Sequence, residues 1–328
     1  MLGYILRRIL IMIPTLFVIS VISFIVIQLP PGDYLTTYAM TLRQQGDSVQ
    51  EEAIQALRDR YGLNQPVIVQ YAKWIWGILS RGDFGQSMEV GRPVKDLIWE
   101  RLALTVVLSL MSIFVSWFIA IPLGVYSATH QYSVVDYVVT TFSFIGVGTP
   151  GFLLALVIMW GAMNYLGLNV GGLFSREFVQ APWSWAKVVD MLKHIWIPVL
   201  ILALNGTAGG LRTTRANLLD ELNKPYVETA RAKGITEAKV IWKYPVRVAL
   251  NPFFSTVGWE LAHLISGSQL VSIVLALETT GPLLLRSLVS QDMYLAGGFL
   301  LLLSALTVIG TLISDIVLAW VDPRIRMT

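Results

Sequence analysis

The sequence contains no cysteine and only three histidines, His130, His194 and His263, which lie far apart along its 328 residues. Without cysteine there are no disulfide bridges, no thiolate metal ligands and no cysteine nucleophile. Three scattered imidazoles do not make a zinc or haem centre, so we expect no metal site. The chain also lacks any Gly-Lys dipeptide, which a phosphate-binding loop requires. We therefore expect no ATP or Mg²⁺ site in this chain.

Charged residues are scarce as well. They make up 14% of the chain, against about a quarter in a soluble domain. Hydrophobic residues make up 55%, and the mean hydropathy is +0.64. This composition excludes a water-soluble globule, and it also excludes fibrous, collagenous and disordered chains, which are polar or rich in Gly and Pro. The net charge of +3 is small, and we expect no nucleic-acid partner.

Six segments are apolar over roughly 20 residues, which is the length that crosses a bilayer as a helix. They are residues 9–29, 102–129, 137–168, 195–211, 253–277 and 294–320. The glycines and proline at 148–151 predict a break in the third segment. The fifth is the weakest, because it contains Glu260 and His263. The pattern predicts an all-α integral membrane protein with six transmembrane helices.

The distribution of Lys and Arg predicts the orientation of these helices. Arg7 and Arg8 precede the first segment, and Arg324 and Arg326 follow the last. Between the fourth and fifth segments, residues 212–247 carry eight basic and four acidic side chains, whereas residues 30–101 carry eight basic and nine acidic ones. We therefore predict that both termini and the loop at 212–251 are cytoplasmic and that 30–101 lies outside.

A secretory signal peptide is the alternative reading of the N-terminus, because basic residues precede an apolar run there. The apolar run spans 21 residues, however, which is longer than the core of an ordinary signal. We therefore interpret Arg7 and Arg8 as a cytoplasmic anchor. The predicted organisation is an N-terminal segment with the first helix (1–29), a periplasmic insertion (30–101) and a core of five helices (102–328).

The periplasmic insertion is expected to be mainly helical. Ser48 and Glu51 form a capping box that predicts a helix over 48–61, and a second helix is predicted over 67–79. The second helix is rich in aromatic residues, which are Tyr71, Trp74 and Trp76. Such residues gather at the membrane–water interface. The alternative is that they cover a ligand or a partner protein.

The cytoplasmic loop has the pattern of two short helices joined at an elbow. Pro225 suits the first position of a helix, and Gly234 suits a stop because a left-handed cap favours a residue without Cβ. A second helix is predicted over 236–244. Small residues, Thr229, Ala230 and Ala232, would let another surface approach closely. The alternative is a basic loop that is attracted only to anionic lipid.

At this loop the sequence resembles a known family. Glu228, Thr229, Ala230 and Gly234 are in register with the EAA loop of ABC importer membrane subunits, with Thr229 where the family often has Ala. Five further segments are similar to the oligopeptide/dipeptide branch of that family: residues 4–8 (YILRR), 60–66 (RYGLNQP), 82–87 (GDFGQS), 244–252 (YPVRVALNP) and 322–326 (DPRIR). The matches span almost the whole chain in the expected order.

The resemblance implies a role, a set of partners and a site. The chain would be a non-enzymatic permease subunit of the bacterial inner membrane that pairs with a second, homologous permease subunit in a heterodimer. Two ATPase subunits, which bind ATP and Mg²⁺, and a periplasmic or lipid-anchored solute-binding protein would complete the importer. The elbow would be the coupling helix that sits on an ATPase. Its implied contact residues are Tyr226, Glu228, Thr229, Ala230, Lys233, Gly234 and Ile235.

Ionisable groups inside the membrane are costly and therefore mark candidate functional positions. Glu260 and His263 are three residues apart and share a helical face, and Gln269 adds a further polar group to the same segment. They are candidates for the translocation path. The alternative is that Glu260 pairs locally near the cytoplasmic end and that His263 is a satisfied packing residue.

Three other functions compete with a peptide importer. The same machinery could carry oligosaccharides or another small solute, since the binding protein usually sets selectivity. A proton-coupled secondary carrier could use Glu260 and His263, although no duplicated half is evident. A membrane-embedded protease would need a paired-Asp, Ser–His or zinc arrangement, and Asp136 and Asp315 stand only at the ends of predicted helices.

Overall fold

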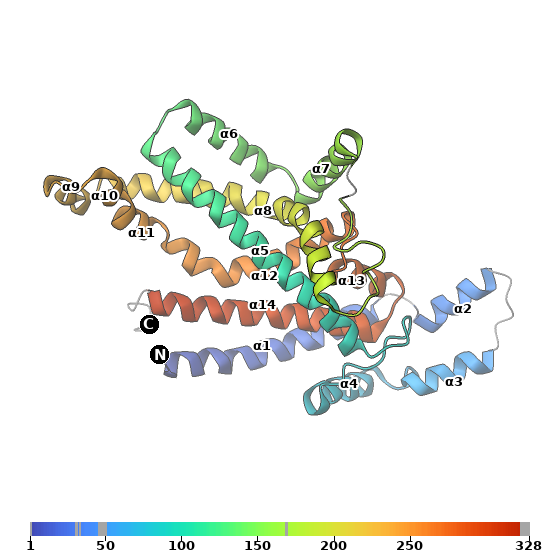
Figure 1. Ribbon diagram of the computed structural model, residues 1–328. Coiled ribbons are helices and arrows are strands. Elements are labelled where there is room, and N and C mark those ends of the chain that lie inside the picture. The colour runs from blue at the N-terminus through green and yellow to red at the C-terminus, as the bar shows by residue number, and fades with distance from the viewer. Residues whose placement is uncertain (1, 30–31, 33, 45–50, 168–169, 322–328) are drawn as a thin grey trace. The chain divides into compact units, whose positions relative to one another are not determined.

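The computed structural model describes residues 2–29, 32, 34–44, 51–167 and 170–321 of the chain (Figure 1). These residues form helices and connecting loops; within the described ranges there is no strand, and only an isolated bridge joins Gln86 to Pro93. The expectation of a helical protein is therefore confirmed.

The helices divide between two compact units, which are described separately. Residues 2–105 and 279–308 form the insertion unit, and residues 106–278 and 309–328 form the core unit. Two helices, α5 and α14, pass from one unit into the other. The helices are α1 (Leu2–Gln28), α2 (Tyr34–Gln44), α3 (Glu51–Tyr61), α4 (Val67–Arg81), α5 (Val94–Thr129), α6 (Val134–Gly148), α7 (Gly151–Leu166), α8 (Trp185–Leu222), α9 (Pro225–Ala232), α10 (Glu237–Lys243), α11 (Pro245–Ala249), α12 (Asn251–Val274), α13 (Thr280–Val289) and α14 (Met293–Val321).

Four of the described helices, α1, α5, α8 and α14, are long and apolar enough to cross a membrane. The pair α6 and α7 would add a fifth crossing if it formed one span, but it bends by 109° at the break. The break lies at Thr149 and Pro150, where the sequence predicts it. The remaining predicted span, 253–277, coincides with α12, many of whose side chains lie outside the described residues. Six crossings therefore stay a prediction.

In the insertion unit, α4 begins at Val67 as predicted and ends at a left-handed cap on Gly82. Trp74 packs with Phe24 of α1 and Leu301 of α14, and the Tyr71 and Ser20 hydroxyls lie 2.7 Å apart. Trp76, by contrast, is 69% exposed. The aromatic residues of α4 therefore have two roles, because one face builds the core of this unit and Trp76 points outward.

Two helices of the insertion unit, α2 and α13, are not among the sequence predictions. The helix predicted over 48–61 is observed from Glu51 onward as α3, while Ser48 and its capping box fall outside the described residues. Both α2 and α13 are short, with 11 and 10 residues, and periodicity over so few residues does not by itself identify a helix.

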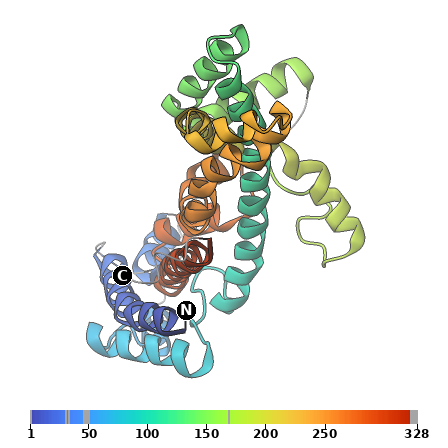
Figure 2. The ribbon, with the colours of Figure 1, turned by 90° about the vertical axis from the view of Figure 1, so that its left-hand side faces the viewer.

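The core unit is built on α8, against which α6 and α11 pack (Figures 1 and 2). Small residues allow this close approach. A Cβ on Gly124 of α5 would lie 2.6 Å from the Thr214 Cβ of α8, and one on Gly146 of α6 would lie 3.0 Å from the Ala208 Cβ. Glycines at such contacts let helix backbones come together, as in other membrane bundles.

Candidate functional site

The elbow that the sequence predicts is present as α9 and α10. α9 begins with Pro225 at its first turn, and the chain reverses at Gly234, whose φ of 71° is a left-handed conformation that favours glycine. Thr236 then precedes α10. The two helices share a small core of their own, made by Val227, Ala230 and Val240 with Ile235 and Tyr244 packed against it.

The predicted contact residues of the elbow differ in their exposure to solvent. Ala230 is buried and Ile235 is half-buried, so both hold α9 against α10. The remaining predicted residues are exposed and available to another surface: Tyr226, Glu228, Thr229, Lys233 and Gly234. The elbow is therefore a packed unit with a polar outer face.

Two residues that the sequence analysis did not single out join the ends of the elbow. The Arg231 guanidinium donates from Nη2 to Glu237 Oε1 at 2.7 Å, and its Nε donates to both carboxylate oxygens at 3.1 Å. This ion pair lowers the pKa of Glu237 and raises that of Arg231. The sequence offers one sign of this ion pair, because Arg231 and Glu237 carry opposite charges and lie six residues apart on either side of Gly234.

Tyr226 links the elbow back to the end of α8. Its hydroxyl donates to Glu221 Oε2 at 2.5 Å. Partial burial, together with the neighbouring carboxylate, raises the pKa of Tyr226 to about 12. The phenol is therefore neutral at physiological pH and remains a hydrogen-bond donor.

The elbow is joined to the membrane helices through a second apolar cluster. Val125 and Ala128 of α5, Leu218 of α8, and Val246 and Ala249 of α11 are all buried against one another. α11 follows α10 directly, since Tyr244 ends one helix and begins the other. Packed side chains therefore connect the elbow, through α11, to the ends of α5 and α8.

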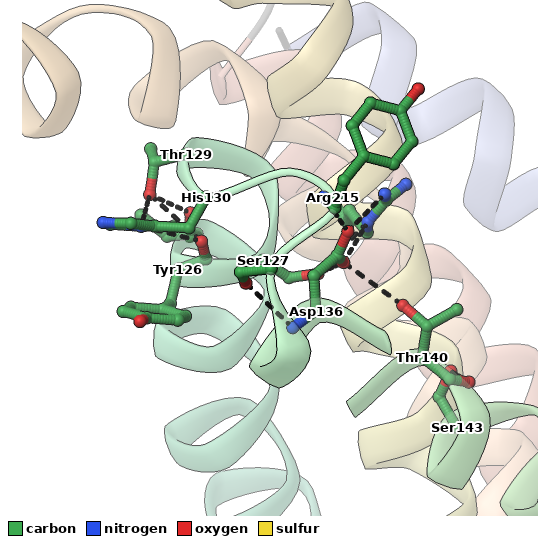
Figure 3. A network of polar contacts seen from close by, with 11 residues as sticks. Tyr126, Ser127, Thr129, His130, Asp136, Thr140, Ser143 and Arg215 are labelled. Atoms are coloured by element: carbon green, nitrogen blue, oxygen red, sulfur yellow. Dashed lines mark hydrogen bonds and ion pairs between the residues drawn. The ribbon is translucent and has the colours of Figure 1, made fainter. Parts of the chain in front are cut away.

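Next to this cluster lies a buried ion pair that holds three helices together (Figure 3). Asp136, on the first turn of α6, is 3% exposed. Arg215 of α8 donates from Nε to its Oδ1 at 2.8 Å and from Nη2 to its Oδ2 at 2.9 Å. The Ser127 hydroxyl, at the end of α5, donates to Oδ1, and the Tyr132 N–H donates to Oδ2 at 2.9 Å.

This geometry makes the ion pair costly to break. A bidentate Arg–carboxylate pair is among the strong hydrogen-bonded arrangements, and loss of Arg215, which is itself 25% exposed, would leave the buried Asp136 carboxylate without its cation. In the sequence, Arg215 is only one of the basic residues of the predicted cytoplasmic loop, and Asp136 is only a residue at the end of a predicted helix.

A cavity of about 620 Å³ lies elsewhere in the core unit, between α5, α7, α8 and α12. Its polar lining consists of Ser112, Ser116, Asn205, Thr213, Ser268 and Glu260. Glu260 is the one charged side chain among the described residues that line the cavity. Gly206, Gly209 and Gly210 of α8 lie along the same wall.

The other two predicted path residues are not placed in this cavity. Gln269 is half-buried, and its Nε2 donates to the Ile265 carbonyl at 2.9 Å. It does not belong to the described lining. The side chain of His263 lies outside the described residues. Only Glu260 of the predicted set therefore reaches the cavity in the part of the chain that the structure describes.

Comparison with known proteins identifies the family. Residues 120–327 match the binding-protein-dependent transport system inner membrane component, and residues 1–111 match the N-terminal part of the same kind of membrane component. The chain belongs to this family. The resemblance that the EAA-like loop indicated is thus confirmed over both halves of the permease sequence.

Similar relatives cover the permease along nearly its full length. It is 37% identical over 327 residues to the oligopeptide transport system permease protein AppB of Bacillus subtilis, covering 99% of this chain and 100% of that protein. It is 31% identical to the peptidoglycan transport system permease protein YejB of Agrobacterium fabrum, covering 98% of each. The inward-facing MetNI methionine ABC transporter matches with a TM-score of 0.47 and 17% identity, over 67% of this chain and 93% of that one.

Proposed function

We propose that this permease is the membrane-spanning subunit of an ABC importer that carries peptide-like solutes across a bacterial inner membrane. The observation that carries the proposal is the full-length similarity to permeases whose names specify oligopeptide and peptidoglycan transport. The apolar helices of the chain are consistent with a multi-pass protein. The subunit is not itself an enzyme on this proposal, because ATP and Mg²⁺ are bound by separate ATPase subunits.

The proposed topology has six crossings, both termini in the cytoplasm and residues 30–101 on the outer side. The charge distribution supports it, since the loop at 212–247 is basic and the insertion is nearly neutral. A second, homologous permease subunit forms the other half of the path, and a solute-binding protein delivers solute to the outer face.

The elbow of α9 and α10 is the proposed docking element for an ATPase subunit. Its exposed residues support this role, because Glu228, Thr229 and Lys233 present a polar face on a unit that already has its own core. The apolar cluster of α5, α8 and α11 offers a route by which ATPase closure moves the membrane helices.

The 620 Å³ cavity is the proposed contribution of this subunit to the solute path. Hydroxyl and amide groups on its wall suit the amides of a peptide, and Glu260 suits a positively charged group. His263 and Gln269 stay candidates for positions farther along the path.

The elbow proposal is tested with the complete complex, purified with its ATPase subunits and reconstituted with its binding protein. Gly234→Pro removes the left-handed turn, and Glu228→Lys reverses a charge on the exposed face. Each is expected to abolish ATPase co-purification or uptake while membrane insertion survives. Asp220→Lys is the matched control, because Asp220 is an exposed acid of α8 that lies before the elbow.

Normal ATPase yield together with normal uptake in both variants would refute the docking role. The substrate class is tested separately by uptake of radiolabelled trialanine against maltotriose. Uptake of maltotriose alone would replace the peptide assignment. Uptake that persists without ATPase subunits and follows the proton gradient would overturn the importer itself.

A further inference from the structure

The ion pair of Asp136 and Arg215 occupies a specific mechanical position in the core unit. Arg215 lies on α8 about 10 Å before that helix ends at Leu222, given a rise of 1.5 Å per residue. Asp136 lies at the opposite connection, on the first turn of α6 just after the turn from α5. The pair therefore joins the helix that leads into the elbow to the hairpin of α5 and α6 (Figure 3).

The other contacts between these helices do not fix their register in the same way. Gly124 against Thr214 and Gly146 against Ala208 are contacts of small groups, which give van der Waals packing with little directional preference. A bidentate guanidinium–carboxylate pair has one productive geometry, because both donors must meet both oxygens. The ion pair therefore selects one arrangement of α6 on α8.

The Asp136 carboxylate accepts further hydrogen bonds besides those from Arg215. Ser127 and Thr140 donate their hydroxyls to Oδ1, and the Tyr132 N–H donates to Oδ2. Tyr132 has a φ of 65°, an uncommon conformation for a residue with a bulky side chain. Asp136 therefore fixes the turn between α5 and α6 as well as the contact with α8.

We propose that Asp136 and Arg215 are a positioning pair that makes α5, α6 and the end of α8 move as one body when the elbow moves. This inference rests on the proposed function, since it assigns the pair to the coupling of ATP hydrolysis to transport. Without the pair, α8 and the end of α5 still move with the elbow through the apolar cluster of α5, α8 and α11, but α6 no longer follows them in one fixed register.

The test uses the reconstituted complex with trialanine as the probe and measures uptake and ATP hydrolysis in the same vesicles. Asp136→Asn and Arg215→Gln are expected to retain ATPase co-purification and hydrolysis, while uptake per ATP falls about tenfold, a size typical of coupling between sites. Arg215→Lys is expected to fall as well, because an ammonium keeps the charge but cannot form the fork.

Arg212→Gln is the matched control. Arg212 is an exposed residue one turn earlier on α8, where its guanidinium lies 4.9 Å from the Phe144 ring centroid. Because Phe144 lies on α6, Arg212→Gln removes the same charge and one less directional contact between α8 and α6, but it leaves the bidentate pair intact. Uptake per ATP should therefore stay unchanged. A purely structural role would instead lower complex yield, hydrolysis and uptake together, and that result would overturn the proposal.

In a second experiment, an engineered disulfide replaces the ion pair as the link between α6 and α8. The chain has no cysteine of its own, so Gly146→Cys with Ala208→Cys introduces one defined pair between α6 and α8. The ideal Cβ at 146 lies 3.0 Å from that of Ala208, so α6 and α8 must separate by about half an ångström to reach the roughly 3.5–4.5 Å that disulfides span. In the Asp136→Asn background, oxidation is expected to recover uptake per ATP and reduction to lose it again.

If uptake per ATP stays low after the disulfide has formed, the proposal that the pair makes these helices move as one body is contradicted. A ratio equal to that of the wild type in both Asp136→Asn and Arg215→Gln contradicts any role of the pair in coupling. Neither result touches the proposed function, which fails only if the wild-type complex itself does not import trialanine with ATP hydrolysis.

Discussion

Single polar residues connect parts of this permease that are distant in sequence. Asp292, just before α14, is fully buried and accepts a hydrogen bond from the Ser87 hydroxyl at 2.6 Å. The N–H groups of Glu89 and Leu295 donate to the same carboxylate at 3.1 and 3.2 Å. Burial outweighs these donors and raises the pKa of Asp292. This residue therefore ties the loop after α4 to the start of α14.

The raised pKa of Asp292 predicts a pH dependence of stability. Since the folded state holds the proton more tightly than the unfolded chain, the contribution of this carboxyl is fully present below the ordinary Asp value. It is lost as the pH rises through the raised pKa. Asp292→Asn cannot titrate. We expect the stability of the wild type relative to Asp292→Asn to decrease with rising pH across this window and then to level off.

Thermal unfolding of the detergent-solubilised permease at a series of pH values measures this difference. Glu237→Gln is a useful comparison, because its exposed pair with Arg231 lowers the pKa of Glu237 and gives the opposite sign. Its effect should be small, since exposed ion pairs contribute only about 0–1 kcal/mol. A relative stability of the wild type that increases with pH would contradict the assignment for Asp292.

At the scale of helices, α5 packs closely on α8 at glycine positions, and the contact at Gly124 is the tightest of them. A Cβ on Gly124 would lie 2.6 Å from Thr214 Cβ and 3.0 Å from the Leu211 carbonyl oxygen. Gly124→Ala must therefore push the two helices apart, and overpacking of this kind costs about 1–3 kcal/mol. We expect a lower unfolding temperature for this variant.

Gly161→Ala is the matched control for that variant. Gly161 lies within α7, and a Cβ there meets nothing within 4 Å. Alanine is a better helix former than glycine by about 0.5–1 kcal/mol, so this variant should be as stable as the wild type or more so. Equal unfolding temperatures for both alanine variants would show that the α5–α8 contact relaxes without cost.

The helix α8 is longer than the apolar segment that predicts it. The sequence predicts a span over 195–211, whereas α8 runs from Trp185 to Leu222. Hydropathy marks the stretch that suits lipid, but a helix continues beyond it as long as its backbone hydrogen bonds are met. Ser184 caps the start of α8 with a hydroxyl that accepts from the Lys187 N–H, and the helix ends at Leu222, shortly before Pro225 begins α9.

At the scale of the whole molecule, the predicted topology can be tested because the chain has no cysteine. Ser80→Cys on α4 and Ala238→Cys on α10 introduce single thiols at exposed positions. A membrane-impermeant maleimide is expected to label Ser80→Cys in intact spheroplasts and Ala238→Cys only in inside-out vesicles. The unsubstituted chain is the blank. Labelling of both thiols from the same side would overturn the proposed orientation.

The sequence by itself determined that the protein is a helical membrane protein, because that conclusion needs only the scarcity of charge and the length of the apolar runs. It also predicted the break at 148–151, the turn at Gly234 and the start of α9 at Pro225, since glycine and proline act on the local backbone. The family resemblance likewise lay in short local motifs.

Only the tertiary structure decided which side chains meet. Asp136 and Arg215 are 79 residues apart, and Ser87 and Asp292 are 205 apart. Nothing in the local pattern distinguishes these residues from other charged or hydroxyl side chains. Their pairing depends on how long helices cross and on where glycines let them approach. Burial then makes these contacts strong, and burial is a property of the folded chain rather than of any segment of it.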